Sequence, residues 1–443
     1  MTSDNVDAAP AELFRDVSWS AWQLCSIALL VAAFILSALS LQALALAAPP
    51  ILEDWHLPVE ALATPMSIGW FGAAIGTIVG GLLGDIWGRK WTVIAALALA
   101  GMATAAIALT TTSFELSAVR IIQGIGLGAF NPPAIAHITE LVGARRKGPM
   151  IGIAMVCGPI GISLCSALAA TLFAHGAWQV LFWISGASLL LVAIVMMLFM
   201  QESPHYEFRV NGRSARLERI VSRLGLEIEE TSSHPAPAGA GVPVSALLSR
   251  HFLFQTVCVG ACFLATFWLI STAMSWLPAL FTYAGYATEV SAGSVPAWSV
   301  GGIAGALIAG WLSAWIGNAR AGLLMAGACM VVLAISAMEV PTMVLMPCLF
   351  LGGLSVSAFL TVLYAYVAQV YPASIRSTAL GIAETAGRLG AVGGSFAGAY
   401  VVGGDGVAAF FGSLAVLAGI ALAVYWISAR TPARASHVTG APG

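Results

Sequence analysis

Charged side chains are scarce in this sequence. Asp, Glu, Lys and Arg make up 9% of the 443 residues, whereas soluble domains carry roughly 25%. Hydrophobic residues make up 59%. This composition excludes an ordinary soluble globular fold and is typical of a polytopic membrane protein. A net charge of −2 gives no overall basic character, so we expect no nucleic-acid partner.

Motifs for catalysis, metal binding and disulfide bonding are missing. The sequence has no G-x-S-x-G, no H-E-x-x-H and no pair of intramembrane aspartates, so we expect a protein that is not an enzyme. None of the seven cysteines forms a C-x-x-C pair, and most lie in apolar stretches as small packing residues. We therefore expect no cofactor, metal or disulfide. A polar, acidic start also predicts no cleavable signal peptide.

Long apolar runs dominate what is present, and they predict twelve membrane-spanning helices. The runs lie near 19–48, 61–87, 91–111, 115–139, 148–174, 178–200, 252–277, 290–316, 321–338, 342–370, 377–402 and 407–427. The predicted fold class is an all-α membrane protein with two six-helix bundles.

The predicted domain boundaries follow from where the apolar runs stop. The bundles are placed at 19–200 and 251–428, with tails at 1–18 and 429–443. A polar central loop at 201–250 joins the bundles. That loop holds a candidate amphipathic helix near 214–230 and a Pro/Ala/Gly linker at 234–241, typical of a solvated hinge.

Basic residues fall on one predicted face of the membrane. Arg120 and Arg388 lie inside spans, and every other Lys and Arg lies in the tails, the central loop or short loops of the same face. The positive-inside rule predicts that this face, with both termini, is cytoplasmic.

A glycine-rich charged stretch, GLLGDIWGRK at 81–90, lies between the second and third spans. It must form a very short hairpin, in which Asp85 can cap the turn or pair with Arg89. A weaker copy, GWLSAWIGNAR at 310–320, keeps the glycine spacing but has Ala314 in place of the acid. The two copies predict a duplicated six-helix unit. The alternative is a generic short basic loop.

This stretch resembles the loop between helices 2 and 3 of the major facilitator superfamily, G-x-L-x-D-x-x-G-R-K. The pattern is met by Gly81, Leu83, Asp85, Gly88, Arg89 and Lys90, with Ile86 replacing the usual base. The R-x-x-Q-G-x-G-x-G spacing that begins at Arg120 resembles a second signature of that superfamily. The resemblance implies a secondary transporter working by alternating access. It also implies gating or conformational roles for Asp85, Gly88, Arg89, Lys90 and Arg376.

Three further motifs resemble the aromatic acid/proton symporters, which import benzoate-, hydroxybenzoate- or muconate-type acids into bacteria. They are Glu202-Ser203-Pro204, Ser275-Trp276-Leu277-Pro278 and Tyr371-Pro372-x-x-x-Arg376. The resemblance implies proton-coupled import of a small aromatic carboxylate across the bacterial inner membrane. The implied partners are that substrate, protons and the lipid bilayer, and the chain is expected to be a monomer. One departure is that the family's D-G-x-D in the first span is replaced by Ser37-Ala38-Leu39-Ser40.

Arg120 is the candidate for the substrate carboxylate. Burying an arginine in a span costs about 2.5–3.5 kcal/mol near the centre, and a guanidinium offers a carboxylate bidentate hydrogen bonds. Snorkelling to the surface is the alternative. The same fourth span has Gly124 and Gly128, which predict close helix contact, and an Asn131-Pro132-Pro133 run that predicts a break. Further substrate-binding candidates are Ser37, Ser40 and Gln42 at a similar depth, and Arg388.

Glu384 is the candidate for proton coupling, because it is the only acid well inside a predicted span. Arg388 follows at i+4 and can pair with it, so a structural ion pair is the alternative. Trp268 and Tyr364 are candidates for stacking an aromatic substrate, although such residues often only pack. The competing functions are proton-coupled export of drugs or sugars, hinted at by Gly158-Pro159, and transport of another small metabolite.

Overall fold

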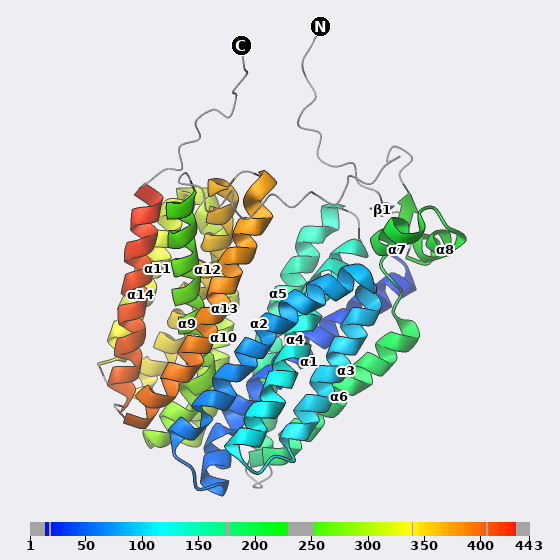
Figure 1. Ribbon diagram of the computed structural model, residues 1–443. Coiled ribbons are helices and arrows are strands. Elements are labelled where there is room, and N and C mark those ends of the chain that lie inside the picture. Colours follow the sequence, from blue (N-terminus) through cyan, green and yellow to red (C-terminus); the bar gives the residue numbers. More distant parts are fainter. Residues whose placement is uncertain are drawn as a thin grey trace. The chain divides into compact units, whose positions relative to one another are not determined.

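The structure is a computed structural model that describes residues 14–16, 19–142, 144–173, 178–224, 226–228, 252–338, 340–371, 373–404 and 406–430. Its contacts divide the chain into two units (Figure 1). Unit 1 comprises Met1–Pro50 and Ile68–Ala240, and unit 2 comprises Ile51–Ser67 and Gly241–Gly443. The linker expected at 234–241 lies outside the described residues.

Six long helices form most of unit 1. They are α1 (Ala21–Asp54), α2 (Ala63–Ile86), α3 (Arg89–Ile107), α4 (Ser113–Glu140), α5 (Ala144–Phe173) and α6 (Trp178–Phe199). The end of α1, the 3-10 helix η1 (Val59–Leu62) and the start of α2 group with unit 2. Two short helices follow α6, namely α7 (Pro204–Asn211) and α8 (Ala215–Leu224). Strand β1 (Phe14–Asp16) pairs antiparallel with β2 (Leu226–Ile228).

Six further long helices form unit 2. They are α9 (Leu253–Tyr283), α10 (Thr288–Ile316), α11 (Asn318–Ser336), α12 (Thr342–Val370), α13 (Ala373–Gly404) and α14 (Gly406–Arg430). Within the described residues, ten helices are long and apolar enough to cross a membrane. The two other long helices, α4 and α13, interrupt their apolar sequence with charged residues. These are the helices that carry Arg120, Glu384 and Arg388.

The expected break at Asn131-Pro132-Pro133 is wrong. Helix α4 is continuous from Ser113 to Glu140 with both prolines inside it. The Asn131 Nδ2 donates to the carbonyl of Leu127 at 3.3 Å and so adds a side-chain bond within the same turn. In an apolar span the other backbone groups find partners only within the helix, which favours its continuation past the prolines.

Close packing of α2 against α4 depends on the expected glycines. A Cβ added at Gly124 would collide with the carbonyl oxygen of Gly69, and one at Gly128 with that of Ala73. Small residues on both helices therefore bring the backbones into contact, as the spacing of Gly124 and Gly128 predicts.

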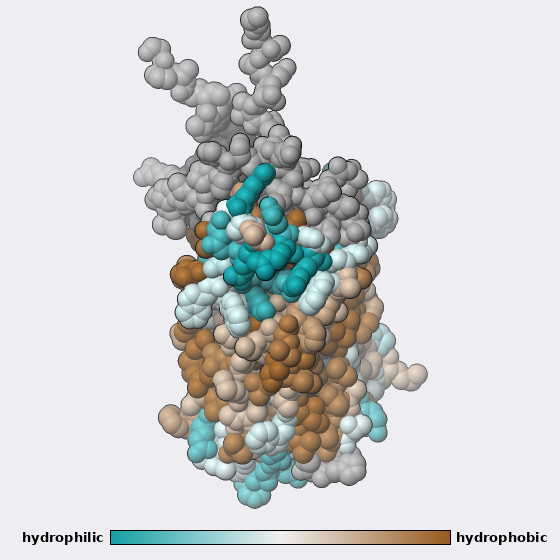
Figure 2. All heavy atoms as spheres, turned by 90° about the vertical axis from the view of Figure 1, so that its right-hand side faces the viewer, coloured by the Kyte–Doolittle hydropathy of each residue, from teal (hydrophilic) through white to brown (hydrophobic). Residues whose placement is uncertain are grey.

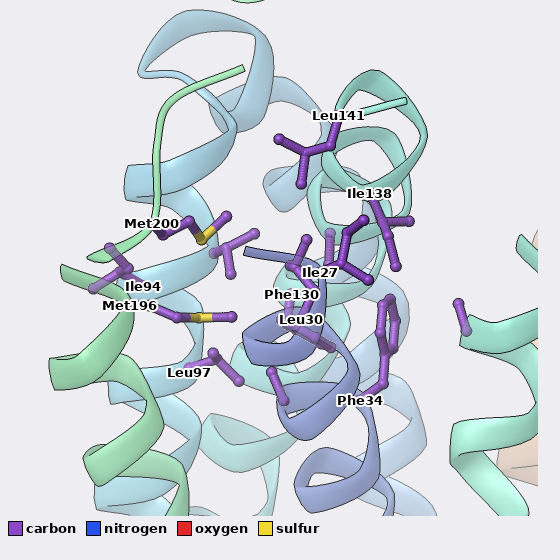
Figure 3. Packing of buried hydrophobic residues seen from close by; sticks show 14 of the residues in the cluster. Ile27, Leu30, Phe34, Ile94, Leu97, Phe130, Ile138, Leu141, Met196 and Met200 are labelled. Carbon is purple, nitrogen blue, oxygen red and sulfur yellow. The ribbon is translucent and has the colours of Figure 1, made fainter. Parts of the chain in front are cut away.

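The core of unit 1 lies between α1, α3, α4 and α6 (Figure 3). Phe34 of α1 and Phe130 of α4 meet edge to face with ring centroids 4.9 Å apart. Helix α8 is amphipathic and lies within the segment predicted for such a helix. Its buried face (Leu217, Ile220, Val221 and Leu224) joins the same core. Full burial of a leucine side chain contributes about 1.5–3 kcal/mol, so α8 is firmly attached to unit 1.

The two copies of the glycine loop share one backbone conformation. Gly88 precedes α3 with φ 98° and ψ 157°, and Gly317 precedes α11 with φ 82° and ψ 152°. Both helices that follow are 19 residues long. Side-chain-bearing residues rarely adopt such angles, so each position requires glycine. The structural repeat agrees with the predicted duplication.

Candidate functional site

Arg120 is buried inside unit 1. It lies roughly 10 Å from the start of α4 by helical rise, and 3% of its surface is exposed. Its Nη1 donates to Oε1 of Gln123, one turn further along α4, at 2.5 Å. The guanidinium also packs against α2, where a Cβ on Gly69 would lie 2.9 Å from Nη2. The cation is therefore held inside the bundle and does not reach its surface by snorkelling.

Gln123 connects Arg120 to two other helices. Its Nε2 donates to Oγ of Ser40 on α1 at 3.0 Å and to Oγ1 of Thr104 on α3 at 2.9 Å. The Ser40 and Thr104 hydroxyls are themselves 2.7 Å apart. All three residues are fully buried. This hydrogen-bonded chain fixes the Gln123 carboxamide with its oxygen toward Arg120, because its nitrogen is committed to the hydroxyls.

The first-span candidates differ in their surroundings. The Ser40 hydroxyl is engaged between helices, as described above. Ser37 is 9% exposed, and its hydroxyl oxygen has no hydrogen-bond partner among the described residues. Gln42 is also buried. A buried hydroxyl without a partner costs free energy, so Ser37 has the capacity to bind a polar ligand.

Glu384 is half-buried and lies roughly 16 Å along α13 from its start by helical rise. Its Oε1 accepts a hydrogen bond from Oη of Tyr364 on α12 at 3.0 Å. Among the ion pairs of the described residues, none joins Glu384 to Arg388. Arg388 lies near enough to interact electrostatically with both Glu384 and Tyr364. The structure thus brings the predicted residues Glu384, Arg388 and Tyr364 into one cluster. Within it, the hydrogen bond of Glu384 is to Tyr364.

Aromatic side chains of α9 cover the glycine face of α13 beside this cluster. The rings of Tyr364 and Phe263 meet edge to face, with their centroids 5.2 Å apart. Trp268 packs against α13 so closely that a Cβ on Gly393 would lie 2.5 Å from its Cζ3. Trp268 is half-buried. Its observed contact is helix packing within unit 2.

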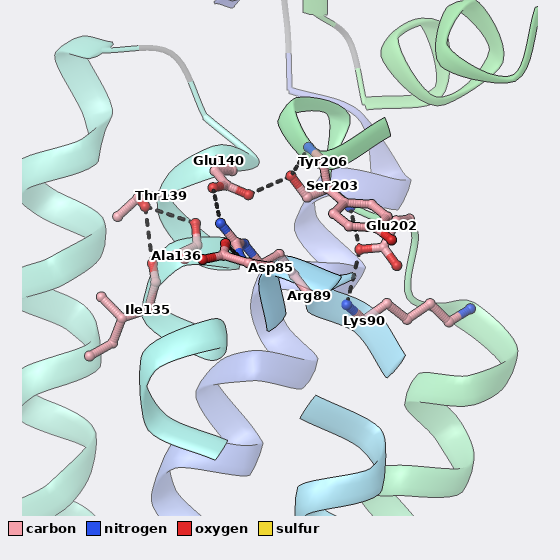
Figure 4. Close-up of polar contacts among 10 residues, drawn as sticks. All are labelled: Asp85, Arg89, Lys90, Ile135, Ala136, Thr139, Glu140, Glu202, Ser203 and Tyr206. Carbon is pink, nitrogen blue, oxygen red and sulfur yellow. Dashed lines mark hydrogen bonds and ion pairs between the residues drawn. The ribbon is translucent and has the colours of Figure 1, made fainter. Parts of the chain in front are cut away.

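The charged loop forms a network at one end of unit 1 (Figure 4). Arg89 Nη1 donates to Oδ1 of Asp85 at 2.5 Å, and its Nη2 lies 3.5 Å from Oε1 of Glu140 at the end of α4. The Ser203 hydroxyl donates to the other oxygen of Glu140. Arg89 therefore connects the α2–α3 turn to the end of α4, and Ser203 extends the network to the start of α7.

Glu202, in the segment after α6, binds the first turn of α3 through backbone hydrogen bonds. Its Oε1 accepts backbone N–H bonds from Lys90 at 3.0 Å and from Ser203 at 2.9 Å. Burial raises the pKa of the Glu202 carboxyl, and these N–H donors partly offset that effect. A Cβ on Gly88 would lie 2.5 Å from Glu202 Oε2, so glycine is required here by space as well as by φ. The Arg376 side chain lies outside the described residues.

Five residues of the hydrogen-bonded and charged networks were not predicted as site residues: Gln123, Thr104, Glu140, Glu202 and Ser203. The last two were quoted only as part of the Glu202-Ser203-Pro204 motif. Gln123 belongs to the quoted R-x-x-Q-G motif, and its position one turn after Arg120 was an available signal. Glu140 is an acid close to the basic loop of that face, which also hints at a pairing role. Thr104 gave no such signal, because an isolated threonine in an apolar helix is common.

The fold and these sites define the class of protein, a helical membrane transporter. Ten of its described helices are long and apolar enough to cross a membrane, and two further long helices, α4 and α13, carry ionisable side chains along their length. The sequence profile of the Major Facilitator Superfamily matches residues 30–348, and the chain belongs to that family. The predictions of the fold class and of a transporter that is not an enzyme are therefore confirmed.

Known relatives are similar over most of their length. The 3-(3-hydroxy-phenyl)propionate transporter of Escherichia coli K12 is 29% identical over 365 residues, which are 81% of this chain and 82% of that protein. The gallate transporter of Pseudomonas putida is 25% identical, covering 80% of each. The 4-hydroxybenzoate transporter PcaK of Pseudomonas aeruginosa is 25% identical, covering 86% of each. These names confirm the resemblance to aromatic acid transporters.

Solved structures share the fold. The xylose transporter XylE from E. coli, in a partially occluded inward-open conformation, is similar with a TM-score of 0.71. The similarity covers 92% of this chain and 98% of that chain at 14% identity, so it extends to the fold alone.

Proposed function

We propose that this protein is a secondary active transporter that imports a small aromatic carboxylate by alternating access, coupled to protons. The observation that carries the proposal is the buried guanidinium of Arg120, oriented by the hydrogen-bonded chain through Gln123. A fixed cation in a low-dielectric span binds an anion strongly, and its planar donors match a carboxylate. Arg388 is the second candidate cation, in unit 2.

The substrate class follows from the relatives. The three named above are transporters of a hydroxyphenyl propionate, of gallate and of 4-hydroxybenzoate. Each of these has a carboxylate group and a hydroxylated aromatic ring. The Ser37 hydroxyl, which has no hydrogen-bond partner in the described part of the chain, is available for a polar group of such a ligand, and Gln42 lies on the same helix. Tyr364 and Trp268 are the candidates for contact with the ring.

Proton coupling is assigned to Glu384. In this proposal Glu384 takes the role of the acids in the family's first-span D-G-x-D motif, because this chain has Ser37-Ala38-Leu39-Ser40 at those positions. The Tyr364 hydroxyl donates to the ionised carboxylate, and protonation of Glu384 weakens that bond. Loss of the carboxylate charge also weakens the attraction between Glu384 and Arg388. The Arg388 cation is then more available to a substrate anion. Protonation and substrate binding are thereby linked.

The membrane orientation is proposed from charge. The basic face carries both termini and lies in the cytoplasm of a bacterial cell, with the protein in the inner membrane as a monomer. Asp85, Gly88, Arg89 and Lys90 then form a cytoplasmic gate element, with Arg376 as a further candidate.

The test is uptake into proteoliposomes containing the purified chain. Labelled 3-(3-hydroxyphenyl)propionate, gallate and 4-hydroxybenzoate are supplied with and without an imposed inward proton gradient. We expect at least one acid to accumulate, and only with the gradient. Arg120→Lys should lose most uptake and Arg120→Ala nearly all, with normal yield and folding. Arg213→Ala is the matched control, because Arg213 is an exposed cation between α7 and α8.

Other results would contradict the proposal. Normal affinity in Arg120→Lys would move the anion site elsewhere, with Arg388 next to be tested. Failure of every aromatic acid to be transported or to compete would exclude the substrate class. Faster efflux than uptake under the same gradient, with drugs or sugars as substrates, would favour the exporter instead.

A further inference from the structure

A basic cavity lies beside α8 in unit 1, apart from the residues assigned to binding the substrate and the proton, and Lys90 is the one residue it shares with the proposed gate element. Its volume is about 290 Å³, and its walls come from the first turn of α3, the segment after α6, and α8. The charged residues of the lining are Lys90, Glu202, Arg216, Arg219 and Arg223. Four cations therefore surround the cavity together with one carboxylate.

The contacts of these groups leave the cavity with an excess of positive charge. Glu202 is 6% exposed, and its Oε1 is engaged by two backbone N–H groups. Arg216 lies 3.5 Å from Glu207, which offsets one cation. Arg219 Nε donates to the carbonyl of Ala215 at 3.1 Å, a neutral partner. Arg223 lies over the ring of Trp22 at 5.3 Å, also without loss of charge.

The surroundings of the cavity are apolar on the side of the spanning helices. Trp91 lines the cavity and is 45% exposed. The last turn of α6 exposes Met197, Leu198 and Phe199. Figure 2 shows hydrophilic side chains gathered directly above a broad apolar band on this side of the molecule. Exposed tryptophans beside a basic patch are typical of the level of lipid headgroups.

We propose that this cavity binds the phosphodiester of an anionic phospholipid, with the acyl chains running along the exposed end of α6. Guanidinium groups match phosphate oxygens with paired N–H donors. Basic pockets at the headgroup level bind anionic lipids, and each nearby cation contributes about 1 kcal/mol. A free phosphorylated metabolite offers the same phosphate chemistry but leaves the apolar wall exposed, so the lipid is favoured.

The test uses the purified full-length chain and does not depend on transport. Native mass spectrometry measures binding of phosphatidylglycerol against phosphatidylcholine, and thermal unfolding is measured with each lipid. We expect preferential binding of phosphatidylglycerol and a higher Tm with it. Arg219→Gln/Arg223→Gln should weaken that preference by about five-fold for each arginine removed, as expected from about 1 kcal/mol each. Arg213→Gln, which removes a cation outside the cavity, should leave the preference unchanged.

Two further arms separate the sources of phosphate and the effects on folding. Arg219→Lys/Arg223→Lys keeps the charge and should keep most of the preference, which distinguishes lost binding from lost structure. Millimolar inorganic phosphate or glycerol 3-phosphate should not raise the Tm. Stabilisation by these soluble anions equal to that by phosphatidylglycerol would overturn the lipid assignment. An unchanged lipid preference in the double glutamine variant, or an equal loss in Arg213→Gln, would overturn the site itself.

Discussion

Replacing Gly88 by alanine should destabilise the charged loop through two separable effects. The backbone angles of Gly88, φ 98° and ψ 157°, cost a residue with a Cβ about 1–3 kcal/mol. The added Cβ would also lie 2.5 Å from Oε2 and 2.9 Å from Cδ of Glu202. The carboxyl group must then move away from the N–H groups of Lys90 and Ser203. Each such bond to a charged group contributes about 1.5–3 kcal/mol.

Gly317→Ala is the matched control for this variant. Gly317 has nearly the same angles, φ 82° and ψ 152°, but an added Cβ there meets nothing within 4 Å. It therefore measures the backbone strain alone. One kcal/mol lowers the Tm of a domain of about 200 residues by about 2–4 °C. Loss of one bond to Glu202 should thus make the Gly88→Ala shift larger by about 3–12 °C.

The assay is thermal unfolding of the purified protein in lipid nanodiscs, with transport rate measured in parallel. In a Glu202→Ala background the clash with the carboxyl is absent, so Gly88→Ala should cost the strain seen at Gly317 and the smaller effect of a contact with Tyr206 Cε1 at 3.1 Å. Equal Tm shifts for Gly88→Ala and Gly317→Ala would refute the role given to Glu202. An undiminished effect of Gly88→Ala in the Glu202→Ala background would do the same.

Four further variants test the gate, the coupling residue with its tyrosine partner, and the buried carboxyl. Asp85→Asn weakens the contact with Arg89, so transport should slow while equilibrium binding stays within a few-fold, and a large loss of binding would contradict a gating role. Glu384→Gln should keep substrate exchange but lose accumulation driven by a pH gradient, whereas Tyr364→Phe should impair coupling only in part; concentrative uptake by Glu384→Gln would make Glu384 structural. Because burial raises the pKa of Glu202, folding favours the protonated carboxyl relative to the unfolded chain, so its contribution to stability is present below the ordinary glutamate value of about 4.3 and is lost as pH rises through the raised value. The Tm of the wild type relative to Glu202→Gln should therefore fall as pH rises from about 4, and a pH-independent difference would count against this.

The sequence by itself determined the architecture and the depth of the unusual residues. Apolar run length and the spacing of turn residues are local properties, so the long helices and the amphipathic α8 were predictable before any contact was known. The repeated glycine loop was equally visible, because only glycine tolerates the backbone of Gly88 and Gly317. Arg120 and Glu384 were identified because a charge within an apolar run is costly wherever the helix packs.

Only the tertiary structure decided which groups meet. The i,i+4 spacing of Glu384 and Arg388 permits an ion pair, yet the short contact of Glu384 is to Tyr364 on another helix. Likewise, Gln123 joins Arg120 to Ser40, 83 residues away from Gln123 in sequence. Such partners depend on the side-chain rotamers and on how closely separate helices approach. Apolar sequence identifies the membrane-spanning helices but hardly predicts which side of each helix contacts another helix, because lipid and protein neighbours are equally apolar.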